Sequence, residues 1–178
     1  MNSKDKITYI SNWIKDYALS INKNPTTLVI GVSGGVDSAL TSTLCALTGL
    51  KTIAVSMPIK QNSSQHDLSL RHLDFLKKKF LNVETKIVDL DNVFKTFQDT
   101  MKNFDSELAF ANSRSRLRMM TLYQIAQSNN GIVVGTGNKV EDFGVGFYTK
   151  YGDGGVDISP IADCTKTEVW ELAEEIGV

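Results

Sequence analysis

The chain has 178 residues, of which 42% are hydrophobic and 22% are charged, with a formal net charge of −1 and a pI of about 6.1. This balance is typical of an ordinary globular domain, and it lacks the basic excess that a large nucleic-acid-binding surface requires. No apolar run approaches the roughly 20 residues of a membrane helix, and segment 1–16 lacks the features of a signal peptide. We therefore expect one cytoplasmic domain, spanning 1–178, that binds neither nucleic acid nor a membrane.

Apolar residues at helical spacing predict helices, and short apolar runs rich in β-branched residues predict buried strands. In chain order, the expected elements are a helix at 4–21, a strand at 27–32, a helix at 36–48, a strand at 51–57, a helix at 63–80, a strand at 83–88, helices at about 90–102 and 106–128, and a strand at 131–135. A stretch rich in glycine covers 136–160, and a capping-box pattern at 165–168 opens a last helix.

The expected strands alternate with helices, and each strand is apolar along its whole length. This pattern is typical of a parallel sheet that is covered on both faces. We therefore predict an α/β fold with a doubly wound, Rossmann-like parallel sheet and helices on both faces. Ligands of such folds bind outside the carboxyl ends of the strands, which here means segments 33–38, 57–65 and 136–150.

The cysteines and histidines carry little functional signal. Cys45 lies in an apolar helical run and is expected in the core, while Cys164 lies near a helix start. Their spacing suggests no disulfide. His66 and His72 share one expected helix and are predicted to lie at the surface, whereas Leu68 of the same helix is predicted to face inward.

The first expected strand and the next helix are joined by the sequence SGGVDS at 33–38. Its adjacent glycines allow close backbone approach, and the amides together with the positive end of the helix predict an anion cradle. Ser33 and Ser38 add hydroxyl groups, and Asp37 adds a hard oxygen ligand that suits Mg²⁺. The pattern differs from the Walker loop, which needs Lys after its last Gly, and from GxGxxG.

SGGVDS after a first strand resembles the signature of the N-type ATP pyrophosphatases. The resemblance implies the adenine nucleotide alpha hydrolase-like fold and cleavage of ATP between its α- and β-phosphates. The class includes NAD synthetases, GMP synthetases, asparagine synthetases and tRNA-modifying enzymes. The motif alone does not choose among them.

Two further motifs narrow the choice: GTGNKVE at 135–141, and GFYTKYGDGGVD at 146–157 followed by Pro160. Together they resemble the ammonia-dependent NAD synthetase family, and the likeness runs from about Ile7 to Val178. It implies that ATP adenylates the nicotinate carboxylate of deamido-NAD, pyrophosphate leaves, and ammonia displaces AMP to give NAD. It also implies a homodimer with the dinucleotide site at the interface, and a further C-terminal segment that completes both sites and is absent here.

The resemblance assigns roles on the ATP side residue by residue. Thr136 and Lys166 match ATP contacts, and Lys166 also matches a catalytic residue. Asp37 and Glu141 match the Mg²⁺ ligands. The spacing from Glu141 to Gly146 is one residue longer than in some relatives, so Asp142 is an alternative ligand. The matched phosphate-binding residues are Gly31, Val32, Ser33, Gly34, Gly35, Val36, Asp37 and Ser38.

On the substrate side, Arg116, Lys150 and Asp157 match contacts to deamido-NAD. Asp153 matches a catalytic residue near the ammonia site, where a carboxylate can take a proton from ammonium. No amidohydrolase domain fits this length, so the expected nitrogen source is free ammonia, with ammonia supplied by a separate glutaminase as the alternative.

Two other functions stay open at this point. The first is another adenylating enzyme of the same class, either GMP synthetase-like or tRNA-modifying. A tRNA-modifying enzyme would need a basic surface, and the net charge of −1 argues against it. The second is a nucleotide-binding regulator without turnover, which the acidic pair Asp37 and Glu141 argues against, since such a pair favours metal-assisted chemistry.

Overall fold

The structure is a computed structural model, and it describes residues 1–21, 26–60 and 63–178. Each element expected from the sequence is present within a few residues of its predicted bounds, and one short π-helix, η1, is additional. The elements are α1 (Ser3–Ile21), β1 (Thr27–Gly31), α2 (Val36–Leu47), β2 (Thr52–Ser56), α3 (Ser63–Lys79), β3 (Val83–Ile87), α4 (Asp91–Thr100), α5 (Glu107–Ser128), β4 (Gly131–Val134), η1 (Val140–Val145) and α6 (Lys166–Ile176).

The described strands form one parallel sheet in the order β3-β2-β1-β4. Val29 at the centre of β1 pairs with Ile53 of β2 on one side and with Val133 of β4 on the other. The chain therefore proceeds outward from β1 to β3 and then returns to add β4 on the opposite side of β1. This reversal makes the gap between β1 and β4 the topological switch point, where doubly wound sheets bind ligands.

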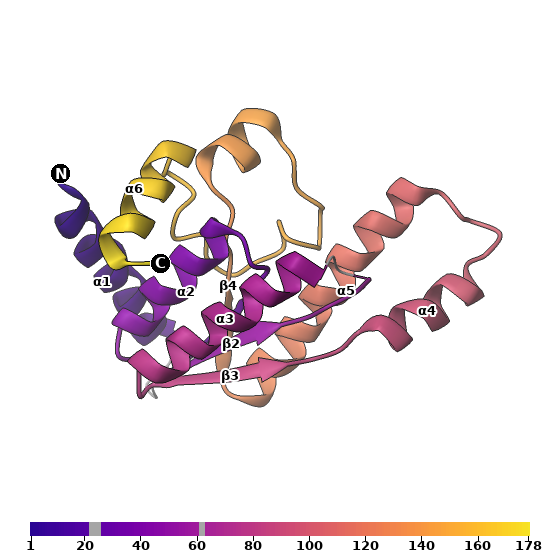
Figure 1. The fold of residues 1–178 in the computed structure, drawn as a ribbon, viewed down its shortest axis with the longest axis horizontal. Helices are drawn as coiled ribbons and strands as arrows, with labels where there is room; N and C mark the ends of the chain where they lie inside the picture. Colours follow the sequence, from indigo (N-terminus) through magenta and orange to yellow (C-terminus); the bar gives the residue numbers. More distant parts are fainter. Residues whose placement is uncertain (22–25, 61–62) are drawn as a thin grey trace.

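Each face of the sheet has its own apolar core, because neighbouring side chains of a strand point to opposite faces. Leu28 and Ile30 of β1 pack in the core formed with α1, α2, α3 and α6. Val29 packs in the second core, which includes residues of α4 and α5. The predicted covering of both faces is thus confirmed. Figure 1 also shows α4 and the first half of α5 extending from the sheet as an arm, and α1 beside α6.

Helix α3 is where the predicted burial differs from the structure. The sequence predicts that Leu73, Leu76 and Phe80 face inward together with Leu68, and the first three do pack against the core, whereas Leu68 is 44% exposed. The prediction that both histidines lie at the surface is wrong, since both are partly buried. His72 Nε2 forms a 2.8 Å hydrogen bond with Ser42 Oγ of α2, and burial lowers the pKa of His72 to about 4.

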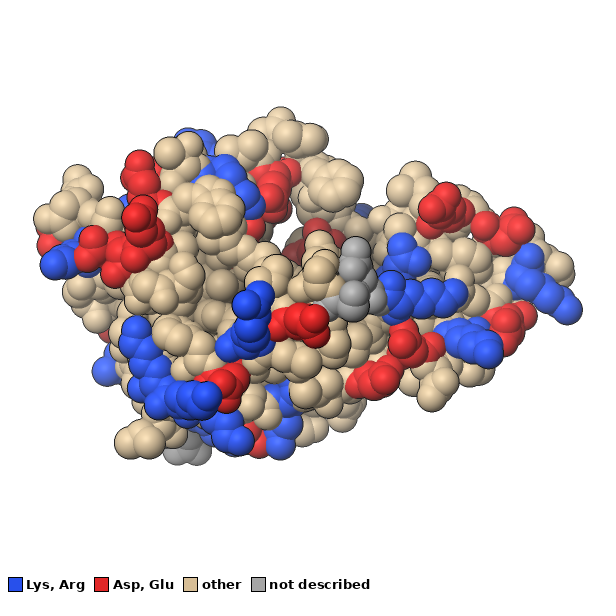
Figure 2. All heavy atoms as spheres, in the orientation of Figure 1, with Lys and Arg blue, Asp and Glu red and all other residues tan. Residues whose placement is uncertain are grey.

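The distribution of surface charge and the burial of the cysteines are as expected from the sequence. Acidic and basic side chains are interspersed over the face in Figure 2 rather than gathered into a basic patch. Both Cys45 and Cys164 are buried, and burial raises the pKa of each thiol. Among the described residues, no helix is long and apolar enough to cross a membrane.

Candidate active site

The loop between β1 and α2 is closed by its own serines. Ser38 Oγ donates to the Gly35 carbonyl oxygen at 2.9 Å and accepts from the Ser33 amide at 3.2 Å. Ser33 Oγ lies 3.2 Å from Ser38 Oγ and accepts from the Gly35 amide at 3.3 Å. Helix α2 begins at Val36, and its N-cap Gly35 has no side chain to take up the first-turn amides. The loop can therefore present backbone amides to an anion at the positive end of α2.

Gly34 fits this loop against α3. Its φ is +95°, and a Cβ at this position would lie 2.4 Å from the Gln65 carbonyl oxygen and 3.2 Å from the Ser69 amide nitrogen. Backbone atoms cannot move aside as the end of a side chain can. A larger residue at position 34 would therefore displace either the loop or the start of α3.

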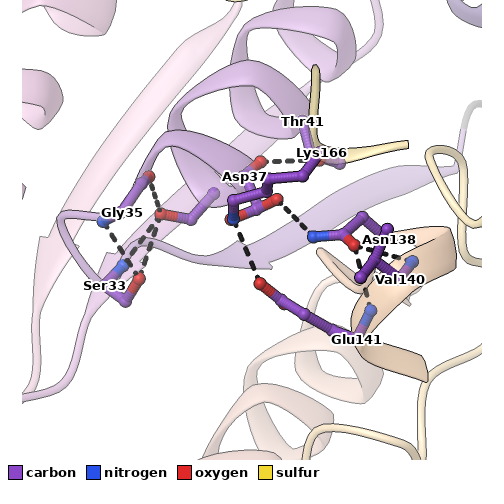
Figure 3. Close-up of polar contacts among 9 residues, drawn as sticks. Ser33, Gly35, Asp37, Thr41, Asn138, Val140, Glu141 and Lys166 are labelled. Atoms are coloured by element: carbon purple, nitrogen blue, oxygen red, sulfur yellow. Dashed lines mark hydrogen bonds and ion pairs between the residues drawn. The ribbon is translucent and has the colours of Figure 1, made fainter. Parts of the chain in front are cut away.

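Four polar side chains from three parts of the chain meet beside the loop (Figure 3). Lys166 Nζ lies 2.5 Å from Asp37 Oδ2 and 3.1 Å from Glu141 Oε1, and it bridges the two carboxylates. Asp37 Oδ1 accepts a 2.8 Å hydrogen bond from Asn138 Nδ2. The predicted pair Asp37 and Glu141 is thus brought together, with Lys166 between its members.

Asn138 is the residue of this cluster that the sequence analysis missed. It is fully buried, and its Oδ1 accepts hydrogen bonds from the Val140 amide at 3.0 Å and the Glu141 amide at 3.1 Å. One side chain therefore holds Asp37 and also fixes the start of η1, which carries Glu141. An available signal was the position of Asn138 just before a turn, since Asn often caps a helix start.

Lys166 is placed by the start of α6. Thr165 and Glu168 form a capping box there, which confirms the pattern read from the sequence, and Glu168 Oε1 also accepts from Lys6 Nζ of α1 at 2.6 Å. Burial alone would lower the pKa of Lys166, but its hydrogen bonds to Asp37 and Glu141 outweigh burial and raise that pKa above its usual value. The ammonium group therefore remains charged at neutral pH.

Carboxylates dominate a small cavity of about 160 Å³ next to this cluster. Its lining includes Asp37, Glu141, Asp142 and Asp153. Burial raises the pKa of Asp142, and the negative charges of Asp153, Glu141 and Asp37 raise it further. Carboxylate oxygens are ligands that suit Mg²⁺. Two of these carboxylates, Asp37 and Glu141, already bind a cationic group, the ammonium of Lys166. Among the residues that the structure describes, no group of three or more such side chains could hold a metal ion by itself. The pair Asp37 and Glu141 therefore fits a magnesium ion that also takes oxygens from a bound phosphate.

Asp142 occupies a different position from its neighbour. Its carboxylate lies against Gly137, where a Cβ would collide with it. Glu141 instead shares Lys166 with Asp37. This arrangement favours Glu141 over Asp142 as the partner of Asp37.

A larger cavity of about 440 Å³ adjoins the loop and has a volume suited to a nucleotide. Its apolar wall includes Met57, Met119 and Leu122, and the predicted ATP contact Thr136 lines it. Arg118, a second residue that the sequence analysis missed, also lines this cavity and donates from Nε to the Met57 carbonyl oxygen at 3.0 Å. Part of the predicted ATP side therefore lines two adjoining cavities at the switch point, namely Gly31, Val32, Ser33, Asp37, Ser38 and Thr136. Lys166 lines neither cavity and contacts the smaller one through Asp37 and Glu141.

The predicted substrate-side residues are more dispersed, although Asp153 lines both cavities. Arg116 Nε donates to the Lys150 carbonyl oxygen at 3.0 Å, and Lys150 Nζ lies 5.1 Å from the ring centroid of Tyr151. Asp157 accepts from the Val133 amide at 2.7 Å. Arg116, Lys150 and Asp157 do not line either cavity as the described residues define them. The structure does not bring these three together with the ATP residues.

Asp153 has a fixed orientation near the mouth of both cavities. Its Oδ1 accepts from Ser115 Oγ at 2.6 Å and from the Thr149 amide at 3.0 Å. Ser115 Oγ in turn accepts from the Asp153 amide at 3.0 Å. Helix α5 and the glycine-rich segment are joined through this pair.

Comparison with known proteins agrees with this geometry. The NAD synthase family matches residues 6–178. An NH(3)-dependent NAD(+) synthetase of Carboxydothermus hydrogenoformans is 36% identical over 100% of this chain and 72% of its own length. Among solved structures, NMN synthetase from Francisella tularensis has a TM-score of 0.89 at 34% identity, covering 100% of this chain and 72% of that one.

A second solved structure is the NH3-dependent NAD synthetase from Campylobacter jejuni in complex with the nitrate ion. Its TM-score is 0.87 at 29% identity, and the match covers 100% of this chain and 75% of that one. The match extends over the sheet, the phosphate loop and the acidic cluster, since it leaves no part of this chain uncovered. The chain belongs to the NAD synthase family of ATP-dependent, amide-forming ligases.

Proposed function

We propose that this chain is an ammonia-dependent NAD synthetase. ATP adenylates the nicotinate carboxylate of deamido-NAD with loss of pyrophosphate, and ammonia then displaces AMP to give NAD. The observation that carries the proposal is the cluster of Asp37, Glu141 and Lys166 at the switch point. It lies beside a cavity of about 440 Å³ that suits a nucleotide.

The ATP half of the reaction uses groups of the loop and of α6. Backbone amides of 33–38 and the positive end of α2 bind the phosphates, and the ammonium of Lys166 neutralises negative charge on them. Asp37 and Glu141 hold Mg²⁺, which when bound polarises phosphate oxygens. Thr136 contacts ATP from the end of β4.

The second half needs deamido-NAD and ammonia at the same place. Arg116, Lys150 and Asp157 bind the dinucleotide, and Asp153 takes a proton from ammonium, because only the free amine can attack the acyl-adenylate. The position of Asp153 in the lining of both cavities supports this role. The rest of the rate acceleration comes from holding two reactants in register.

A homodimer belongs to the same proposal. Leu108 and Met120 of α5 are 72% and 64% exposed, and Phe104 just before α5 is exposed as well. Met120 lies one helical turn from Arg116, so a second copy that covers Met120 would also approach Arg116. Sedimentation that shows only monomer at micromolar concentration would contradict a site shared between two subunits. We also place the enzyme in the cytoplasm, which subcellular fractionation checks.

One assay tests the proposed reaction. Purified protein with ATP, Mg²⁺, ammonium and deamido-NAD should release pyrophosphate and form NAD in equal amounts. Omission of deamido-NAD should stop pyrophosphate release. Pyrophosphate release that requires tRNA or xanthosine monophosphate instead would identify another adenylating enzyme of the same class. Nucleotide binding without any release would identify a regulator.

A mononucleotide substrate is the second candidate. The solved structure with a TM-score of 0.89 and 34% identity is that of an NMN synthetase, which makes a mononucleotide product. The dispersed positions of Arg116, Lys150 and Asp157 leave the dinucleotide side unassembled within one chain. Nicotinate mononucleotide should therefore be assayed beside deamido-NAD, and the larger kcat/KM decides between the two substrates.

A further inference from the structure

The further inference concerns Lys166 in the chain without ATP, and it rests on the proposed assignment of Asp37 and Glu141 as metal ligands. We propose that the ammonium of Lys166 acts as a resident counter-ion that keeps Mg²⁺ off these carboxylates until ATP binds. ATP then draws the ammonium to its phosphates and leaves the two carboxylates to the metal. Lys166 thereby makes metal binding and ATP binding depend on each other.

The contacts of Asp37 support this exchange. Its Oδ2 accepts from Lys166 Nζ at 2.5 Å, and its Oδ1 accepts from Asn138 Nδ2 at 2.8 Å. The Asp37 side chain is only 15% exposed, so solvent screens these contacts weakly. A divalent ion that binds Asp37 on the side of Glu141 therefore meets the ammonium group already there. Two cations that share the same oxygens repel each other strongly at such short range.

The charges around the cluster explain why a cation is needed before ATP arrives. Asp37, Glu141, Asp142 and Asp153 line one small cavity, whereas Lys166 is the basic residue that contacts two of them. Without a nearby positive charge, the carboxylates that line this cavity would repel one another. The ammonium of Lys166 stabilises the ligand pair in its paired arrangement while the phosphate site is vacant.

The location of Lys166 allows the exchange to occur. Its side chain is 39% exposed and stands on a flexible four-carbon stem, so the ammonium can move without displacing α6. The phosphate loop begins at Ser33, which lines the same cavity as Asp37 and Glu141. The triphosphate of ATP bound there carries more negative charge than the two carboxylates that Lys166 contacts. By linkage, ATP and the metal must each raise the affinity of the other.

The experiment measures Mn²⁺ binding to the purified chain by calorimetry in the absence of any nucleotide. Lys166→Met should bind Mn²⁺ about tenfold or more tightly than the wild type, because one repelling charge has been removed. Lys166→Arg keeps the charge and should bind as weakly as the wild type. Circular dichroism confirms that each variant is folded, and the arginine variant gives a second test if the methionine variant is unstable.

Two controls locate the effect. Lys139→Met removes an exposed lysine whose side chain has no hydrogen bond or ion pair with the residues that the structure describes, and it should bind Mn²⁺ as the wild type does. Adding Glu141→Gln to Lys166→Met should abolish the gained affinity. Equal Mn²⁺ affinity of the wild type and Lys166→Met, or a gain in Lys139→Met as large as that in Lys166→Met, would overturn the inference.

The result is independent of the proposed reaction. A wild type that makes NAD, together with a Lys166→Met variant that gains no Mn²⁺ affinity, refutes the counter-ion role alone. A wild type that makes no NAD refutes the proposed function, while the nucleotide-free binding data still report on Lys166.

Discussion

The ATP half and the dinucleotide half of the site are held together in different ways. On the ATP side, Asp37 is bonded to Asn138 and to Lys166, which lie 101 and 129 residues away in the sequence. On the dinucleotide side, Arg116 binds the backbone of Lys150, and Asp157 binds the backbone of Val133. The contacts of Asp37 thus join side chains that lie more than 100 residues apart in the sequence. The contacts on the other side span 24 to 38 residues and include the side-chain bonds from Ser115 to Asp153 and from Tyr123 to Asp157. Substitutions in the first half should impair chemistry, and those in the second should impair substrate affinity.

Removing a carboxylate from the ATP half should have the largest effect. Asp37→Asn and Glu141→Gln should each lower pyrophosphate release roughly 100-fold or more, because each removes the charge of a proposed metal ligand while the fold is kept. Stopped-time pyrophosphate assays at saturating ATP measure this loss. Asp142→Asn is the matched control and should retain most of the activity. The reverse result, with Glu141→Gln active and Asp142→Asn inactive, would move the metal site to Asp142.

Asn138→Ala should rank second. It frees Asp37 and the start of η1, and the loss of such a supporting contact commonly costs about 10- to 100-fold in activity or metal affinity. It should also lower the free energy of unfolding by about 1–3 kcal/mol, since buried partners are left unpaired. A titration of activity against Mg²⁺ separates the two effects.

Asn82→Ala provides the control for Asn138. Asn82 Nδ2 donates to the carbonyl oxygens of Ala46 and Leu50, near the start of β3 and away from the site. This variant should lose stability and keep the wild-type dependence on Mg²⁺. If it also needs more Mg²⁺, the effect of Asn138→Ala would be a general loss of stability.

Two arginines on α5 test the comparison directly. Arg116→Ala should raise the KM for deamido-NAD by about 10- to 100-fold, which corresponds to about 1.5–3 kcal/mol for a hydrogen bond to a charged group. Arg118→Ala should chiefly raise the KM for ATP, because Arg118 lines the larger cavity. Steady-state kinetics with each substrate varied in turn provide the measurement. Equal increases of both KM values in both variants would mean that the two halves are not separable.

The smallest effect is expected at the anchor of α6. Hydrogen bonds from Lys6 and Thr165 lower the pKa of Glu168 to about 2, below its usual value of 4.5. The contribution of this carboxylate to stability is therefore present above pH 4.5 and is lost as the pH falls toward 2. Because Glu168 is partly exposed, Glu168→Gln should cost less than about 1 kcal/mol at pH 7. Urea unfolding at several pH values should show the difference between variant and wild type shrinking in that window; a constant difference would contradict it.

The sequence was sufficient for the elements and for the phosphate loop, because both depend on local patterns. Apolar periodicity located the strands, and SGGVDS identified the loop by its own residues. The bridge from Lys166 to Asp37 and the bond from Asn138 were not predictable in this way, since each joins segments that only the fold brings together. On α3 the inward positions of Leu73 and Leu76 were predicted correctly, but those of Leu68 and His72 were not, because the spacing of apolar residues does not specify which neighbouring helix covers each side.

The π-helix η1 is a place where this chain can gain or lose a residue. The Gly146 amide bonds to the Glu141 carbonyl oxygen five residues back, where an α-turn would reach back four. A turn of this kind accommodates one residue more than an α-turn. Glu141 lies at the start of the turn and is held there by Asn138. Deletion of Gly144 should convert η1 into an α-turn with Glu141 still beside Lys166, which makes this turn a tolerant site for insertions and deletions next to residues that tolerate little substitution.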